Sequence, residues 1–121
     1  MAGDDPYSKR DGETIRELPS GLEIVRRRKH EAIKLAGLSA ESLRRLTNKT
    51  FGSKFIASWN VERVVAFVAE RVLAEGWSSE TGQISLVVEM NETVGYVNGR
   101  TVTAIKIVSD GRYIHAYPVE G

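Results

Sequence analysis

Two segments near the end of the chain hold the side chains best suited to acid–base chemistry. Residues 100–109 and 112–119 are rich in β-branched and aromatic residues, a composition typical of strands. Asp110-Gly111 lies between them and predicts a two-residue hairpin loop. Because side chains alternate between the two faces of a sheet, one face of this hairpin should be polar. Its predicted members are Lys106, Tyr113, His115 and Tyr117.

A two-residue loop at Asp110-Gly111 also predicts a register. Counting outward from the loop places Lys106 directly opposite His115, with a tyrosine two residues away on either side of that histidine. The opposite face should belong to the core, because its side chains are all apolar. They are Ile105, Ile107, Ile114 and Ala116.

A lysine, a histidine and tyrosines on one face fit the cleavage of RNA by its own 2′-hydroxyl group. That reaction needs a base for the hydroxyl proton, an acid for the leaving 5′-oxygen and a cation for the charged phosphorane. Histidine titrates near physiological pH, and tyrosine can stack on a base or orient the phosphate. No metal and no cofactor is expected. An ordinary solvent-facing sheet surface is the alternative interpretation of the same residues.

Basic residues are concentrated in one stretch although the net charge of the chain is only +1. Residues 22–54 hold nine Lys and Arg against three Glu, and the remainder holds eight against thirteen acidic residues. Such a block favours a polyanionic partner such as nucleic acid. A solvated helix face explains it equally well. The candidate substrate-binding residues in this block are Arg27, Lys49, Thr50 and Lys54.

Two helices are expected in the first part of the chain. Ser20 and Glu23 have the spacing of a capping box and Gly37 is a typical helix stop, which together predict a helix between Ser20 and Gly37. This helix would contain His30. Ser39 can cap a second helix that is short and carries few apolar residues.

The strongest helical pattern covers residues 61–75. Asn60 is a suitable N-cap, and Gly76 is a suitable stop. Between them a continuous apolar stripe recurs at helical spacing. It consists of Val61, Val64, Val65, Val68 and Val72.

Strand patterns dominate after Trp77, and Asn98-Gly99 predicts a further hairpin. Helices followed by strands predict an α+β fold, with N-terminal helices packed on a C-terminal antiparallel sheet of about four strands. Residues 1–18 lack hydrophobic periodicity and are interpreted as a flexible arm or linker remnant. Residues 19–121 are then expected to form a single domain.

Composition excludes several classes of function. The chain has no cysteine, which rules out disulfide frameworks, thiolate metal sites and cysteine nucleophiles. Two histidines argue against a His-rich metal site. No apolar run is long enough to span a membrane, and the polar N-terminus does not have the pattern of a signal peptide.

Three segments resemble the EndoU-type and ribonuclease A-like toxin domains of bacteria. AGLSAESLRRL (36–46), KFIASWNVERVVAFVAERV (54–72) and GRYIHAYPV (111–119) follow one another in the order found in that family. The resemblance implies a metal-independent endoribonuclease that leaves a 2′,3′-cyclic phosphate, with tRNA one candidate substrate. It also implies the C-terminal part of a larger secreted effector, used in contact-dependent or polymorphic-toxin competition. Such a domain acts in the target-cell cytoplasm, is bound by a cognate immunity protein and is monomeric when free.

The resemblance assigns roles to three residues. Tyr117 matches the active-site tyrosine of the closing strand, and His115 stands where a substrate-contacting threonine is usual. His30 lies in the region that supplies a catalytic histidine, although the ribonuclease A-like pattern places that histidine near Leu35. A rearranged histidine pair, with Lys106 or a loop lysine as the cation, is the main interpretation. The alternatives are an inactive domain, a non-catalytic module that binds RNA or protein through residues 22–54, and a scaffold domain that pairs through a sheet edge.

Overall fold

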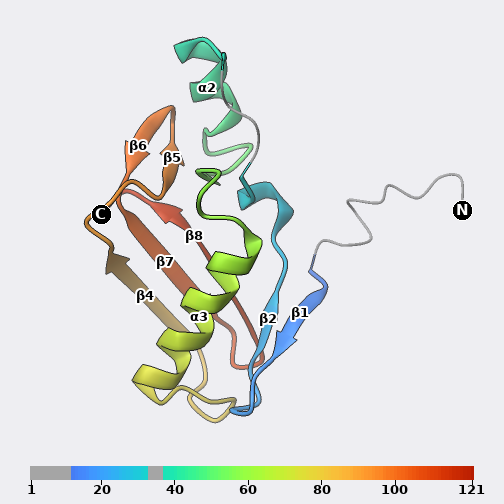
Figure 1. Ribbon diagram of the computed structural model, residues 1–121. Helices are drawn as coiled ribbons and strands as arrows, with labels where there is room; N and C mark the ends of the chain where they lie inside the picture. Colours follow the sequence, from blue (N-terminus) through green and yellow to red (C-terminus); the bar gives the residue numbers. More distant parts are fainter. Residues whose placement is uncertain (1–11, 33–36) are drawn as a thin grey trace, which may run out of the picture.

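The computed structural model describes residues 12–32 and 37–121 and confirms the α+β class (Figure 1). In this part of the chain two α-helices accompany eight strands and one 3-10 helix. In chain order the elements are β1 (Thr14–Glu17), β2 (Glu23–Val25), η1 (Arg28–His30), α2 (Ala40–Leu46), β3 (Lys54–Phe55), α3 (Val61–Glu75), β4 (Ile84–Glu89), β5 (Gly95–Val97), β6 (Arg100–Val102), β7 (Ala104–Ser109) and β8 (Tyr113–Val119).

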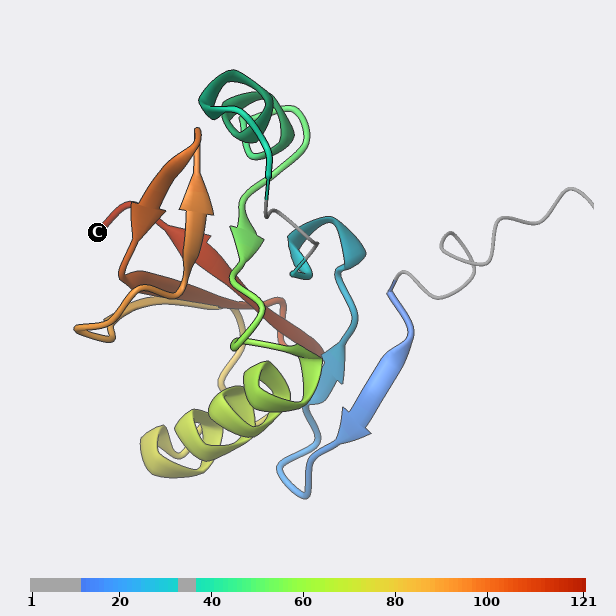
Figure 2. The same cartoon turned by 45° about the horizontal axis from the view of Figure 1, so that its top comes forward.

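The strands form two sheets. The larger has the order β1-β2-β8-β7-β4 and is antiparallel except where β2 runs parallel to β8. The smaller has the order β3-β5-β6. Helix α3 lies across one face of the large sheet, while α2, the β5–β6 hairpin and η1 gather at one end of the molecule (Figures 1 and 2). The core therefore lies between α3 and the sheet, and the loops at one end are left to build a surface.

Helix α3 has the predicted bounds. The Asn60 side chain accepts a hydrogen bond from the backbone N–H of Arg63, and Gly76 ends the helix in the left-handed conformation. Three residues of the predicted stripe, Val65, Val68 and Val72, are buried in the core. They join the apolar face of the β7–β8 hairpin, as the alternation of side chains predicted.

The helix predicted between Ser20 and Gly37 is wrong. Residues Glu23–Val25 form β2, and Arg28–His30 form a single 3-10 turn; residues 33–36 lie outside the described part. Gly21 has a positive φ of 94° and closes a tight turn before β2, which breaks a helical path. Ile24 pairs with Ile114 of β8 and is buried with Leu22, so tertiary pairing overrides the local helical signal.

The large sheet begins before Pro19, the predicted start of the domain. Thr14–Glu17 forms β1 and pairs with β2 in antiparallel fashion. Those four residues belong to the segment interpreted as an arm, and its residues 1–11 lie outside the described part.

One hairpin turn was predicted correctly and the other was not. Asn98-Gly99 joins β5 to β6, both residues with positive φ, and Val97 pairs with Arg100. At the second turn the two-residue loop is Gly111-Arg112, because the Asp110 N–H donates to the Tyr113 carbonyl. The Asp110 carboxylate stabilises this loop by accepting from the backbone N–H groups of both Arg112 and Tyr113.

Candidate functional site

The observed loop shifts the register of the β7–β8 hairpin by two residues. Lys106 therefore lies opposite Tyr117 and His115 lies opposite Val108, so the predicted Lys106–His115 pair is wrong. A shift of two keeps every side chain on its face. The predicted polar group is still on one side, half-buried, and the predicted apolar group is buried on the other.

Tyr117 brings the two histidines of the chain into one cluster. Its ring stacks on that of His30, with the centroids 4.7 Å apart and the planes 16° apart. The same ring stacks on His115 at 5.8 Å and 22°. His30 comes from η1 and the other two from β8, so the contact joins residues far apart in the sequence.

His30 is held by Ser53. Its Nδ1 lies 2.8 Å from the Ser53 carbonyl oxygen and 3.2 Å from Ser53 Oγ. A carbonyl oxygen only accepts, so Nδ1 carries the proton and Nε2 keeps its lone pair. Burial lowers the pKa of His30 to about 4, although the hydrogen bond to the Ser53 carbonyl acts in the opposite direction and raises this pKa. The ring is therefore neutral at physiological pH.

The second ring nitrogen of His30, Nε2, is not fully buried. In the described part of the chain, Ser20 Oγ is the one fully buried side-chain polar atom that lacks a partner. Nε2 makes no hydrogen bond within this part and is not such an atom, so it is not fully buried, although His30 as a whole is only 8% exposed. A neutral, oriented imidazole nitrogen that is not fully buried is suited to accept a proton.

His115 is in a different electrostatic setting. Its pKa is lowered first by burial and then by the positive charge of Arg27, with Lys29 acting in the same direction and Asp110 against them. These two cations would favour an anion beside the ring. An anion bound between them would offset their effect and raise the pKa of His115.

An open groove of about 660 Å³, called here the histidine groove, lies over this cluster. Its walls include His30, His115 and Tyr117, the cations Arg27, Lys29 and Lys49, and the amides Asn48 and Asn98. None of the described residues that line it is acidic. The groove is therefore positively charged and contains two imidazole rings.

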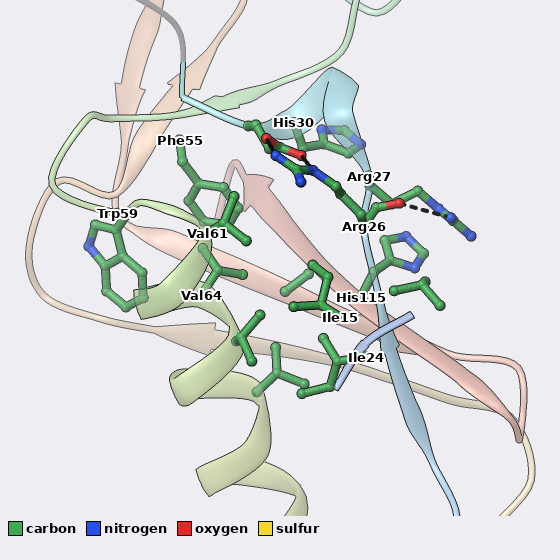
Figure 3. A pocket seen from close by; sticks show the side chains of 15 residues that line it. Ile15, Ile24, Arg26, Arg27, His30, Phe55, Trp59, Val61, Val64 and His115 are labelled. Atoms are coloured by element: carbon green, nitrogen blue, oxygen red, sulfur yellow. Dashed lines mark hydrogen bonds and ion pairs between the residues drawn. The ribbon is translucent and has the colours of Figure 1, made fainter. Parts of the chain in front are cut away.

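A small apolar cavity of about 40 Å³ lies beneath the histidines (Figure 3). Valines of α3, including Val61 and Val64, line it from one side, and His30 and His115 line it as well. Arg26 and Glu31, which form an ion pair with Nε and Oε2 2.7 Å apart, line it as well. Both histidines thus have one side against apolar atoms, which is the origin of the burial that lowers their pKa values.

The remaining predicted site residues lie outside the histidine groove. Lys54 is buried, and its ammonium donates to the carbonyls of Phe51 and Gly52 at 2.7 and 3.0 Å. Burial lowers its pKa. Thr50 is exposed in a turn that the Asn48 side chain closes. Tyr113 and Lys106 do not line the groove, and Arg112 lies over the Tyr113 ring.

Two groove residues, and the role of a third, escaped the sequence reasoning. Ser53 orients His30, and Asn48 and Asn98 line the groove. Asn98 had been assigned to a turn, and no local signal connects Ser53 with a histidine 23 residues earlier. Lys29 lies in the basic run, but periodicity could not show which member of the run faces the site.

No protein-family model, curated protein or solved structure matches this chain. None of the helices in the described part is both long and apolar enough to cross a membrane. Within residues 12–32 and 37–121, no three His, Asp or Glu side chains are grouped so that they could hold a metal ion.

Proposed function

We propose that this protein is a metal-independent endoribonuclease that uses the 2′-hydroxyl of RNA as the nucleophile. The observation that carries the proposal is the stacked cluster of His30, Tyr117 and His115 in a groove lined by cations and by no acidic group among the described residues. The reaction needs a base, an acid and positive charge at one phosphate. The histidine groove contains groups suited to all three.

His30 is the proposed base. Its Nε2 is unprotonated, because Nδ1–H is committed to the Ser53 carbonyl. Nε2 accepts the proton of the 2′-hydroxyl while a bond forms between the 2′-oxygen and phosphorus. The stack on Tyr117 fixes the orientation of the ring, so the lone pair is directed before the substrate binds.

His115 is the proposed acid. A phosphate beside Arg27 and Lys29 offsets the charges that lower the pKa of His115. The ring then carries a proton that it donates to the leaving 5′-oxygen as the phosphorus–oxygen bond breaks. The products are a 2′,3′-cyclic phosphate and a 5′-hydroxyl, and the cations of the groove stabilise the phosphorane between them. Tyr117 positions the substrate.

The proposal extends to the biological setting that the resemblance implies. The domain acts on RNA, with tRNA one candidate, in the cytoplasm of a target bacterium. A larger secreted effector delivers it as its C-terminal part. A cognate immunity protein blocks the groove. Acidic side chains of that protein would complement the cations that line the groove, Arg27, Lys29 and Lys49.

The test is incubation of bacterial RNA with the protein in the presence of EDTA, followed by a denaturing gel. We expect fragments with cyclic phosphate ends. His115→Ala should lower the rate at least a hundredfold. His30→Asn should do the same, because the asparagine amide can still donate to the Ser53 carbonyl but offers no base.

A matched pair of variants controls for damage to the strand. Tyr117→Phe and Tyr113→Phe each remove one hydroxyl from the same face of β8, and only Tyr117 lines the groove. Slower cleavage by Tyr117→Phe alone supports the site. Full activity of His115→Ala contradicts it. Intact RNA together with salt-sensitive binding would instead establish a non-catalytic RNA-binding module.

A further inference from the structure

A second groove of about 700 Å³ adjoins the histidine groove. It is called here the arginine groove, because Arg44 and Arg45 of α2 and Arg100 of β6 line it. Glu41 and Glu120 also line it. Asn48 and Asn98 line both grooves, so the two hollows share one wall. A bound chain can pass from one groove to the other across these two amides.

Hydrogen bonds of Thr47 hold the shared wall together. Thr47, which is 1% exposed, accepts a hydrogen bond at its Oγ1 from the Gly99 N–H at 2.7 Å. Its carbonyl accepts from the Asn98 N–H at 2.8 Å. The tip of the β5–β6 hairpin is thus attached to the end of α2, and the two grooves keep their relative position before any ligand binds. Such preorganisation lowers the entropic cost of binding.

The groups on this path are available to a ligand. Asn48 Oδ1 accepts from the N–H groups of Thr50 and Phe51, which leaves its NH₂ group as a donor. Within the described residues, no carboxylate lies within 4.0 Å of the guanidinium of Arg44, Arg45 or Arg100. Glu41 and Glu120 therefore do not neutralise these arginines by direct pairing.

The charges form a track. Among the described residues, six cationic side chains and two carboxylates line the two grooves, and the cations occur on both sides of the shared wall. A single phosphate would need one cluster of cations. A series of cations along a path instead matches the repeated charges of a phosphodiester backbone. Arginine is also the side chain best suited to paired hydrogen bonds with phosphate.

We propose that the arginine groove binds the backbone of a single RNA strand beyond the phosphate that is cleaved, and that the strand crosses Asn48 and Asn98. This inference rests on the proposed ribonuclease function and defines its substrate as an RNA strand longer than a dinucleotide. The two asparagine amides hydrogen-bond to the nucleotide that spans the wall.

The test compares two double variants that remove the same charge. Arg45→Gln/Arg100→Gln changes the arginine groove, and Arg16→Gln/Arg71→Gln changes arginines that line neither groove. The probe is a single-stranded 2′-O-methyl RNA dodecanucleotide, which cannot be cleaved by 2′-hydroxyl attack. We expect the first variant to bind it more weakly, and the slope of log affinity against log salt to fall by about 1.4, which is about 0.7 for each lost phosphate contact.

Cleavage of short and long substrates completes the test. The first variant should raise KM for an RNA dodecanucleotide with unchanged kcat, and should cleave a dinucleotide like the wild type. Equal weakening by the two double variants contradicts the track, as does unchanged binding by the first. Absence of cleavage by the wild type would overturn the proposed function, and the binding measurement would still decide on the track.

Discussion

Two regions of this molecule are stabilised in different ways. Between α3 and the large sheet, stability comes from apolar side chains that are almost completely buried, such as Val68 and Ile107. The site layer, defined as η1, residues 47–55 and the β5–β6 turn, is positioned by individual hydrogen bonds that involve Ser53, Lys54 and Thr47. The difference suits one region to the fold and the other to the proposed chemistry. Many apolar sequences can be buried in a core, whereas oriented hydrogen bonds position individual side chains.

The largest effect on stability is expected from the core. Ile107 is completely buried on β7, and Ile107→Ala should lower the free energy of unfolding by about 4 kcal/mol through lost burial and a cavity. Urea unfolding followed by tryptophan fluorescence measures the loss. The folded fraction should keep the wild-type kcat/KM, because the groove residues do not depend on this side chain. A loss below about 1 kcal/mol would show that the apolar layer is not the main source of stability.

The next effect is a loss of stability in acid that begins in the site layer. Burial lowers the pKa of His30 from 6.5 to about 4, so folding favours the neutral ring. The neutral ring makes its full contribution to stability above pH 6.5, and this contribution is lost as the pH falls from 6.5 to about 4. The largest resulting decrease in the free energy of unfolding is about 3 kcal/mol, because each pKa unit corresponds to about 1.4 kcal/mol.

Unfolding curves at a series of pH values test this prediction. His30→Asn should remove most of the slope between pH 6.5 and 4. His115→Ala should remove a smaller part, because the pKa of His115 is lowered too and acts in the same direction. Hydrogen exchange in acid should rise first in η1 and around Ser53. An unchanged slope in His30→Asn would contradict the burial of a neutral His30.

The difference between the core and the site layer also determines which features could be predicted from the sequence. Helix α3 was predicted to the residue, because its cap, its valine stripe and its terminal glycine are local signals. The faces of β7 and β8 were also predicted, because alternation survives a register shift of two. The helix between Ser20 and Gly37 failed because β2 is specified by its pairing with β8, about ninety residues away.

The candidate site was predictable only in part. His115 and Tyr117 could be grouped because they lie on one strand, two residues apart. The stacking of His30 on Tyr117 could not be foreseen, since it depends on the path of residues 23–30 and on the Ser53 carbonyl. Lys54 was predicted to bind substrate because a charged side chain is usually exposed. In the structure its ammonium group is buried and donates to two backbone carbonyls.

A smaller effect should come from the hydrogen bonds of Thr47. Thr47→Val keeps the shape but leaves the Gly99 N–H and the Leu43 carbonyl without the hydroxyl. The expected cost is about 1–3 kcal/mol, together with weaker binding of the 2′-O-methyl dodecanucleotide. Thr101→Val, at an exposed position of β6, is the control and should change stability by less than about 0.5 kcal/mol. Similar losses in both variants would mean that the shared wall of the grooves is not especially constrained.

The smallest effect on stability is expected from a pair of lysines, which should differ in their effect on RNA binding. Lys49 lines the histidine groove, whereas Lys106, the lysine that hairpin register placed beside His115, does not. Lys49→Gln should raise KM for RNA severalfold and lower the salt slope by about 0.7. Lys106→Gln should leave both unchanged, and neither should alter the unfolding midpoint appreciably. The reverse result would mean that the substrate contacts the face of the β7–β8 hairpin that carries Lys106. The cation of the proposed reaction would then be Lys106 of the large sheet and not a lysine of the site layer.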